Sequence, residues 1–338
     1  MTDVHTIAGP ADEILAKGFI AADDVLKLRR DVFGDDGVVD RGEAEMLFLL
    51  DRAIADKAPE WYEFYVDSLT DYFVWKTEPR GYVSEEQADF LIENIVHDGR
   101  IDGLSELELL ANIVHWAASC PERLVLFVLE AVRESVLTPD AAAYGKGRKP
   151  GVITDTDVEL VRRVLYGQGS FGGFTVTRRE AELLFALNEA TPEVDNSPHW
   201  RDLFMRAVAN YLMFPRSAPE VPSAAAMRER EAWEPQRRGV GRLLREMGKA
   251  GLNFSDSWRE ADLFGARRAR EEAEREAARR HEAIARQSID EGEARWLLDR
   301  LGDKVELSEN ERALLRFIKE DAPHIHPSLG GLFERAAV

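Results

Sequence analysis

Two short loops of this chain hold the residues best suited to bind a metal ion. They read DDGVVDRGE and DGRIDGLSE, and in each an Asp-Gly pair is followed, one residue later, by an aliphatic residue and an aspartate. Because Ca²⁺ and Mg²⁺ prefer oxygen ligands, the spacing indicates a candidate site for a divalent cation. The candidate ligands are Asp35, Asp36, Asp40 and Glu43 in the first loop and Asp98, Asp102 and Glu106 in the second.

The first loop matches only the second half of a calcium-binding EF-hand loop. With Gly37 at the sixth position, Glu43 falls at the twelfth, where the motif needs a bidentate carboxylate. Val32 and Gly34 would then occupy the first and third positions, and neither offers a side-chain oxygen. In the second loop the twelfth position is Ser105. The full calcium motif is therefore absent, and helix capping by these acidic residues is the favoured interpretation.

No other pattern identifies a catalytic site. Residues 167–174 (GQGSFGGF) have the glycine spacing of a nucleotide-binding loop, but the segment before them is expected to be helical rather than a strand. Cys120 is the single cysteine, which excludes an intramolecular disulfide and a cysteine-based zinc site. An enzyme whose site is assembled from scattered carboxylates is kept as an alternative.

The composition narrows the class of partner. Among 338 residues, 63 are Asp or Glu and 44 are Lys or Arg, so the formal net charge is −19 at pH 7. Such a negative field repels phosphate backbones, and we expect no nucleic-acid partner. The chain has no run of 18 apolar residues and no signal-peptide pattern in its first 18 residues. We therefore expect a cytoplasmic protein without a membrane span.

An internal duplication organises the chain. Residues 18–34 (GFIAADDVLKLRRDVFG) align with residues 151–167 (GVITDTDVELVRRVLYG), and further on Trp61 aligns with Trp200. A second pair of similar segments begins at residues 81 and 287. The predicted order is a first half at 1–140, a linker at 141–150 and a second half at 151–338. The repeats are A1 (18–78), B1 (81–137), A2 (151–216) and B2 (287–338).

The local patterns within each repeat are helical. Ser84 followed by Gln87, and Thr154 followed by Asp157, have the spacing of capping boxes. Apolar residues recur at intervals of three and four, which is typical of amphipathic helices. We therefore predict an all-α fold built as a tandem array of helix–loop–helix units, with a third helix in each repeat, for example at 60–75 and at 122–137.

A charged helical insertion at 222–286 separates A2 from B2. Its basic residues outnumber its acidic ones, opposite to the rest of the chain, and its last part reads as a long surface helix with opposite charges three and four residues apart. A solvated surface helix is the favoured interpretation of the insertion. The alternative is a partner-binding arm, because aromatic residues that interrupt the charges need burial somewhere. They are Trp233, Phe254, Trp258 and Phe264.

The loop–helix pattern resembles that of tellurite-resistance TerB-like domains. The segments DGVVDRGEAEMLFLL and DGRIDGLSELELLANIV, at residues 36–50 and 98–114, carry the resemblance. It implies an acidic, all-helical, non-catalytic domain associated with metal-ion stress responses. A2 has no carboxylate in its loop at 167–174, and B2 lacks the Asp-Gly turn, so any metal site should be confined to the first half.

These observations predict a non-enzymatic helical-repeat scaffold that binds a protein partner and needs no cofactor. The alternative is a divalent-metal sensor in which a cation at the acidic loops reorients the helices and exposes apolar surface.

The sensor alternative makes a direct prediction. A cation at 100 times its dissociation constant should stabilise the fold by about 2.7 kcal/mol, which raises the melting temperature of the metal-stripped protein. Replacing Asp36→Asn together with Asp40→Asn should abolish that rise. Thermal melting with and without millimolar Ca²⁺ or Mg²⁺ measures it, and an unchanged shift in the double variant would end the hypothesis.

Overall fold

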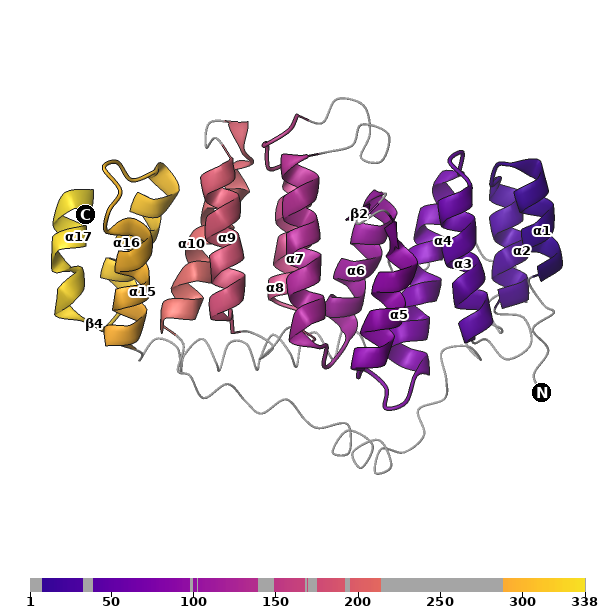
Figure 1. Cartoon of the computed structure of the whole chain (residues 1–338), viewed down its shortest axis with the longest axis horizontal. Coiled ribbons are helices and arrows are strands. Elements are labelled where there is room, and N and C mark those ends of the chain that lie inside the picture. Colours follow the sequence, from indigo (N-terminus) through magenta and orange to yellow (C-terminus); the bar gives the residue numbers. More distant parts are fainter. Residues whose placement is uncertain are drawn as a thin grey trace. The chain divides into compact units, whose positions relative to one another are not determined.

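Helices account for most of the chain that the structure, a computed structural model, describes. The described residues are 8–32, 39–97, 100–101, 103–138, 149–167, 169, 175–191, 195–213 and 288–337. Among them, strands are only two residues long: β1 (Val96–His97) pairs antiparallel to β2 (Arg100–Ile101), and β3 (Ser288–Ile289) pairs parallel to β4 (His324–Ile325). The all-α fold class is therefore confirmed (Figure 1).

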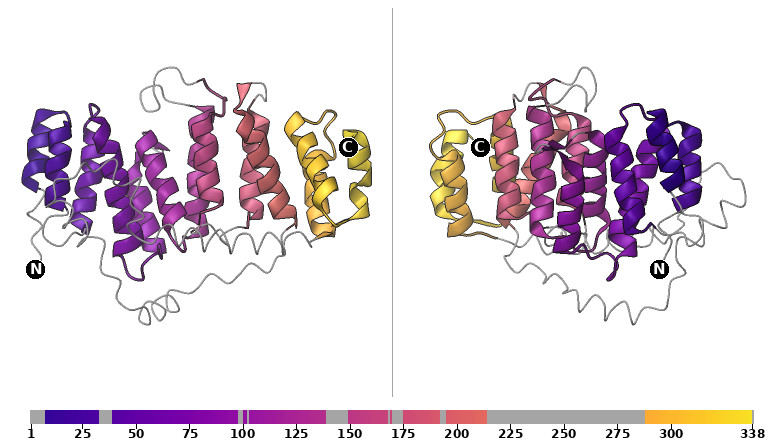
Figure 2. Two further views of the ribbon diagram at one scale, coloured as in Figure 1. Left: turned by 180° about the vertical axis from the view of Figure 1, so that it is seen from behind. Right: turned by 45° about the vertical axis from the view of Figure 1, so that its right-hand side comes forward.

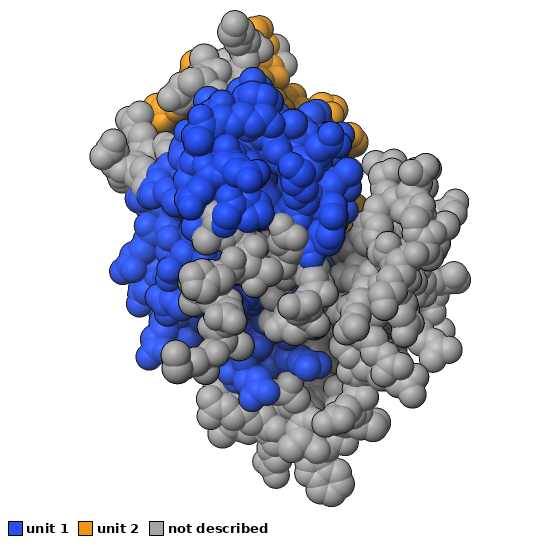
Figure 3. Space-filling model, turned by 90° about the vertical axis from the view of Figure 1, so that its right-hand side faces the viewer, with its two compact units in different colours: residues 1–121, 222–270 blue, residues 122–221, 271–338 orange. Residues whose placement is uncertain are grey.

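The chain divides into two compact units, coloured separately in Figure 3. Among the described residues, unit 1 contains those up to Pro121 and unit 2 those from Glu122 onward. The helix at Glu122–Leu137, placed in B1 by the sequence analysis, packs most extensively on the two helices that follow it and belongs to unit 2. Residues 141–148 of the expected linker and the whole insertion at 222–286 lie outside the described residues.

In unit 1 the helices stand side by side (Figures 1 and 2). Helix α4 packs against α2, α3 and α6. The third helix expected at 60–75 is divided, because a π-helical segment, η1, continues α4 after Thr70. The elements are α1 Ala8–Lys17, α2 Ala22–Val32, α3 Arg41–Ala53, α4 Pro59–Thr70, η1 Asp71–Lys76, α5 Glu85–Ile95, β1 Val96–His97, β2 Arg100–Ile101 and α6 Leu104–Trp116.

In unit 2 helix α10 occupies the central place, since it packs against α8, α9 and α16. Helix α7, predicted at 122–137, has those bounds. The elements are α7 Glu122–Leu137, α8 Asp155–Leu165, α9 Arg178–Ala190, α10 Pro198–Met213, β3 Ser288–Ile289, α15 Glu291–Leu301, α16 Glu309–Asp321, β4 His324–Ile325, η3 Pro327–Leu329 and α17 Gly330–Ala336.

Capping boxes start many of these helices. Ser84 and Gln87 cap α5 reciprocally, and Thr154 and Asp157 cap α8, which confirms both predictions from spacing. Each box supplies partners for backbone N–H groups that a helix start leaves without an intrahelical acceptor. The same arrangement begins α3, α9, α15 and α16.

A backbone clasp recurs at equivalent places in the four predicted repeats. In each predicted repeat, a buried aliphatic residue precedes the first helix. Its backbone forms hydrogen bonds with the segment that precedes the third helix. In A1, for example, Ile20 N donates to Asp56 O over 2.9 Å, and Ala58 N donates to Ile20 O over 2.8 Å. Val83 in B1, Ile153 in A2 and Ile289 in B2 take the corresponding place. These bonds join segments of the chain that are distant in sequence.

The glycines at the start of these clasps generate a prediction. Gly18 and Gly81 both have a φ of 76°, at which a residue with a Cβ costs about 1–2 kcal/mol. A methyl group at position 81 would also lie 3.2 Å from Cβ of Ala118, whereas position 18 has no described atom within 4 Å. Gly81→Ala should therefore destabilise unit 1 more than Gly18→Ala. Urea unfolding of the two variants measures the difference, and equal losses would contradict a role for the Ala118 contact.

Candidate functional site

An open groove lies on unit 2 between α7, α9 and α15. Its volume is about 570 Å³, and both apolar and charged side chains line it. The apolar residues are Leu126 and Phe127 of α7 with Leu183 and Ala186 of α9. The charged residues are Glu130 of α7, Arg179 and Glu182 of α9, and Arg300 of α15.

Helix α9 contributes half of this lining because of its residue spacing. Its four groove residues recur at intervals of three and four, so they share one face of the helix. Leu184 and Phe185, on the other side, are buried in the core. At its N-terminus, Thr177 and the buried Glu180 form a capping box. The helix is thus fixed on its inner face and at its start, while its outer face lines the groove.

Trp296 holds α15 beside α9. Its ring packs edge-on against Phe185 and Tyr211, with ring centroids 5.4 and 4.8 Å apart respectively. Its Nε1–H donates to Oε1 of Glu182 over 3.3 Å. Arg300 lies one turn further along α15, with its guanidinium 6.0 Å from the Trp296 ring. This aromatic anchor places Arg300 at the rim of the groove.

Glu182 is the electrostatic centre of the groove. Partial burial would raise the pKa of its carboxyl group, but hydrogen bonds from Arg178 and Trp296, together with the positive charges of Arg178 and Arg300, outweigh that effect and lower the pKa. Arg178 Nε donates to Oε1 over 3.0 Å, and Nη2 of Arg300 lies 3.7 Å from the same oxygen. Glu182 is therefore ionised at neutral pH and occupied by partners within the chain.

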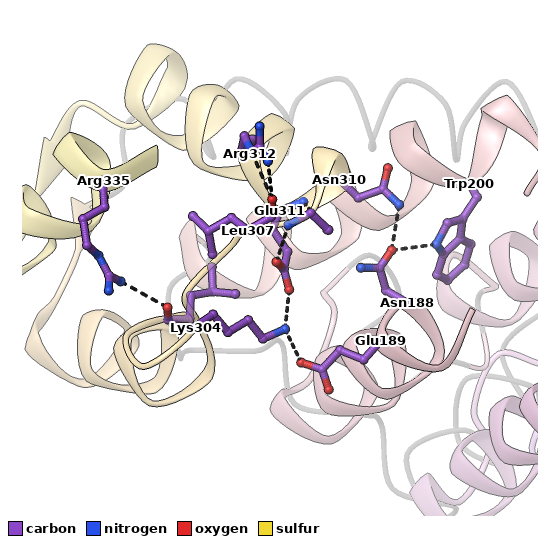
Figure 4. Close-up of polar contacts among 11 residues, drawn as sticks. Asn188, Glu189, Trp200, Lys304, Leu307, Asn310, Glu311, Arg312 and Arg335 are labelled. Atoms are coloured by element: carbon purple, nitrogen blue, oxygen red, sulfur yellow. Dashed lines mark hydrogen bonds and ion pairs between the residues drawn. The ribbon is translucent and has the colours of Figure 1, made fainter. Parts of the chain in front are cut away.

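A buried polar junction connects α9 to α10 and α16 (Figure 4). Oδ1 of Asn188 accepts from Nε1 of Trp200 over 3.0 Å and from Nδ2 of Asn310 over 2.7 Å. All three residues are buried. The junction thus satisfies polar groups that would cost free energy if buried without partners, and it links the helix that lines the groove to the rest of unit 2.

A lysine at the edge of the junction adds a second link. Lys304 Nζ lies 2.6 Å from Oε1 of Glu189 and 2.6 Å from Oε1 of Glu311 (Figure 4). Burial alone would lower the pKa of Lys304, but these two carboxylates raise it. The lysine thus bridges α9 and α16 as a cation.

Unit 1 contains a junction at the matching positions of the predicted repeats. Oδ1 of Asp51 accepts from Trp61 Nε1 and from Lys57 Nζ, each over 2.6 Å, and its Oδ2 accepts from Ser105 Oγ over 3.3 Å. Asp51 and Trp61 align with Asn188 and Trp200 in the sequence, and Ser105 and Asn310 are each the second residue of their helix, α6 and α16. In both units, the acceptor on one helix binds an indole N–H and a donor from the start of a third helix.

The two junctions differ in charge. Unit 1 has the ion pair Asp51–Lys57, whereas the matching positions of unit 2 hold the neutral residues Asn188 and Asn196. Asn196 instead accepts from Ile153 N over 2.8 Å and donates to Thr191 Oγ1 over 3.1 Å. A buried carboxylate needs a countercharge, and a neutral amide does not. Each junction therefore satisfies the groups that it buries.

The acidic residues predicted as metal ligands have structural roles where they are described. Oδ1 of Asp40 accepts from Glu43 N, and Oε2 of Glu43 accepts from Asp40 N, so the two residues cap α3. Glu106 is buried and accepts from Gly103 N at the start of α6. Asp35, Asp36, Asp98 and Asp102 lie outside the described residues. Within the described part of the chain, no three His, Cys, Asp or Glu side chains gather into a possible metal site.

The predicted partner-binding aromatics Trp233, Phe254, Trp258 and Phe264 also lie outside the described residues. Sequence reasoning missed the groove, because its lining comes from three separated helices. One face of α9 carries both charged and apolar residues, and this pattern is the feature of the sequence that could have indicated part of the groove.

Comparison of this chain with protein-family models, with curated proteins and with solved structures found no match. None of the helices that the structure describes combines the length and the apolar character needed to cross a bilayer.

The charge difference between the junctions predicts how stability changes when unit 2 receives the junction residues of unit 1. Asn188→Asp buries a carboxylate without the lysine that unit 1 provides, and it should destabilise unit 2 by about 1–3 kcal/mol. Adding Asn196→Lys should recover part of that loss. Chemical unfolding of both single variants and the double variant forms a double-mutant cycle. If the free energies of unfolding lost in the two single variants simply add in the double variant, the expected coupling is contradicted.

The lowered pKa of Glu182 predicts a pH-dependent contribution to stability. A carboxyl group whose pKa is lower in the folded than in the unfolded state stabilises the fold above its unfolded pKa and loses this effect as the pH falls through the folded value. Glu182→Gln should therefore lower the melting temperature at pH 7, and the difference from wild type should shrink below about pH 4. A difference independent of pH would contradict this electrostatic origin.

Proposed function

We propose that this chain is a non-enzymatic helical-repeat protein that acts in the cytoplasm as a protein-interaction scaffold. The observation that carries the proposal is the groove of unit 2, in which apolar residues of α7 and α9 are bordered by charged ones. An apolar groove between helices suits the apolar face of an amphipathic helix, one of the common modes of peptide recognition.

The chemistry of the groove favours binding over proton transfer. A general base or acid works best when its pKa lies near the operating pH. The pKa of Glu182 is instead lowered, and its Oε1 is held by Arg178 and Trp296. Glu130 is paired with Arg133 on its own helix. These carboxylates are suited to positioning the arginines around the groove.

The surroundings of the groove are those of a preorganised surface. Helix α9 is held by the Asn188 junction, by the lysine bridge from Lys304 and by its capping box. A surface that does not reorganise on binding loses less conformational entropy and binds more tightly. This supports recognition of a partner by the groove as it stands.

Other parts of the proposal rest on the sequence. The insertion at 222–286, with Trp233 and Trp258, is proposed to extend the partner-binding surface. The all-α fold is compatible with the TerB-like resemblance, and a role in metal-ion stress is proposed on that resemblance alone.

Photocrosslinking tests the scaffold function. We would replace Leu183 in the groove, or Val305 as a fully exposed control outside it, with p-benzoylphenylalanine in cells that naturally make the protein. A discrete crosslinked adduct is expected at position 183 and not at 305. The adduct should disappear when Phe127→Asp is introduced into the same chain. Identical adducts from both positions would contradict a specific partner in the groove.

A further inference from the structure

The two arginines of the groove retain spare N–H donors. Arg179 makes one ion pair in the described part of the chain, from Nη1 to Oε2 of Glu122 over 3.3 Å, and its side chain is 66% exposed. The nearest approach of Arg300 to Glu182 is 3.7 Å, which is long for a hydrogen bond. Because a guanidinium carries five N–H donors, both residues can donate hydrogen bonds to a further anionic group.

Each carboxylate of the groove has a hydrogen-bond partner within the chain. Oε1 of Glu182 already accepts from Arg178 and Trp296. Both oxygens of Glu130 bond to Arg133, with a distance of 2.9 Å between Arg133 Nε and Oε2. Arg179 and Arg300 therefore have N–H donors available to a ligand at two edges of the α9 face.

We propose that the groove docks an amphipathic helix of a partner protein whose apolar stripe is flanked by Asp or Glu side chains. The apolar stripe would cover Phe127, Leu183 and their neighbours, and the flanking carboxylates would pair with Arg179 and Arg300. This inference rests on the proposed scaffold function and adds the chemistry of the partner.

The net charge of the chain predicts the opposite preference from the one that we infer for the groove. At −19, the overall field attracts basic segments and repels acidic ones. A preference for an acidic helix can therefore arise only from local donors such as those of Arg179 and Arg300. General electrostatics alone predicts the opposite preference, so the two explanations separate in one measurement.

The probes are three fluorescein-labelled helical peptides with the same leucine stripe, flanked by Glu, Gln or Lys. Fluorescence anisotropy with the full chain gives the dissociation constant of each. The Glu peptide is expected to bind about tenfold more tightly than the Gln peptide, and the Lys peptide most weakly. Tightest binding of the Lys peptide to the wild-type chain would overturn the inference.

Charge reversal identifies the arginine responsible. Arg300→Glu should reverse the order of the three peptides, and the milder Arg300→Gln should reduce the preference for Glu, because Arg179 still pairs with one flank. The matched control is Arg295→Glu, because Arg295 is on the same helix, is 71% exposed and does not line the groove. The control should keep the wild-type order. The same change of order in Arg295→Glu and Arg300→Glu would overturn the assignment to the groove.

The outcomes separate this inference from the scaffold function. Equal binding of all three peptides that is lost in Leu183→Asp would retain the groove as an apolar docking site and reject the role of the arginines. Failure of all three peptides to bind would reject helix docking, while a specific adduct at position 183 would still support a partner of another kind.

Discussion

A buried tryptophan destabilises its surroundings unless its indole N–H finds an acceptor, and this constraint organises both units. Trp61 and Trp200 are fully buried, and each donates to one polar side chain on the preceding helix. The same residue also accepts a hydrogen bond from a third helix, through Ser105 of α6 or Asn310 of α16. One buried polar side chain thus joins three helices in each unit.

The junctions also show that the same geometry can be built with or without charge. In unit 1 a buried aspartate pairs with the ammonium group of Lys57, while in unit 2 Asn188 accepts from Trp200 and Asn310 without an ion pair. Burial of Tyr65 beside Asp51 and Glu106 raises its pKa well above the usual range, and the matching residue of unit 2 is Phe204. The junction of unit 1 is thus charged, whereas the Asn188 junction of unit 2 is neutral.

The groove depends on these internal contacts. Its walls come from α7, α9 and α15, and α9 is fixed from within by Asn188 and from α15 by Trp296. The internal hydrogen bonds of Glu182 leave N–H donors of Arg179 and Arg300 available at the rim. Local N–H donors thus lie on the surface of a chain whose net charge is −19.

The helices and their caps could be predicted from the sequence alone. Helix class, the caps at Ser84 and Thr154 and the helix at Glu122–Leu137 depend on residues a few positions apart, whose interactions follow from helical spacing. Spacing could not decide whether Asp40 and Glu43 cap a helix or bind a cation, because a carboxylate can do either. Only the tertiary structure showed the caps and brought Glu182 to Trp296 and Asn188 to Asn310 across more than a hundred residues. Packing of distant helices makes these contacts, and no local pattern encodes them.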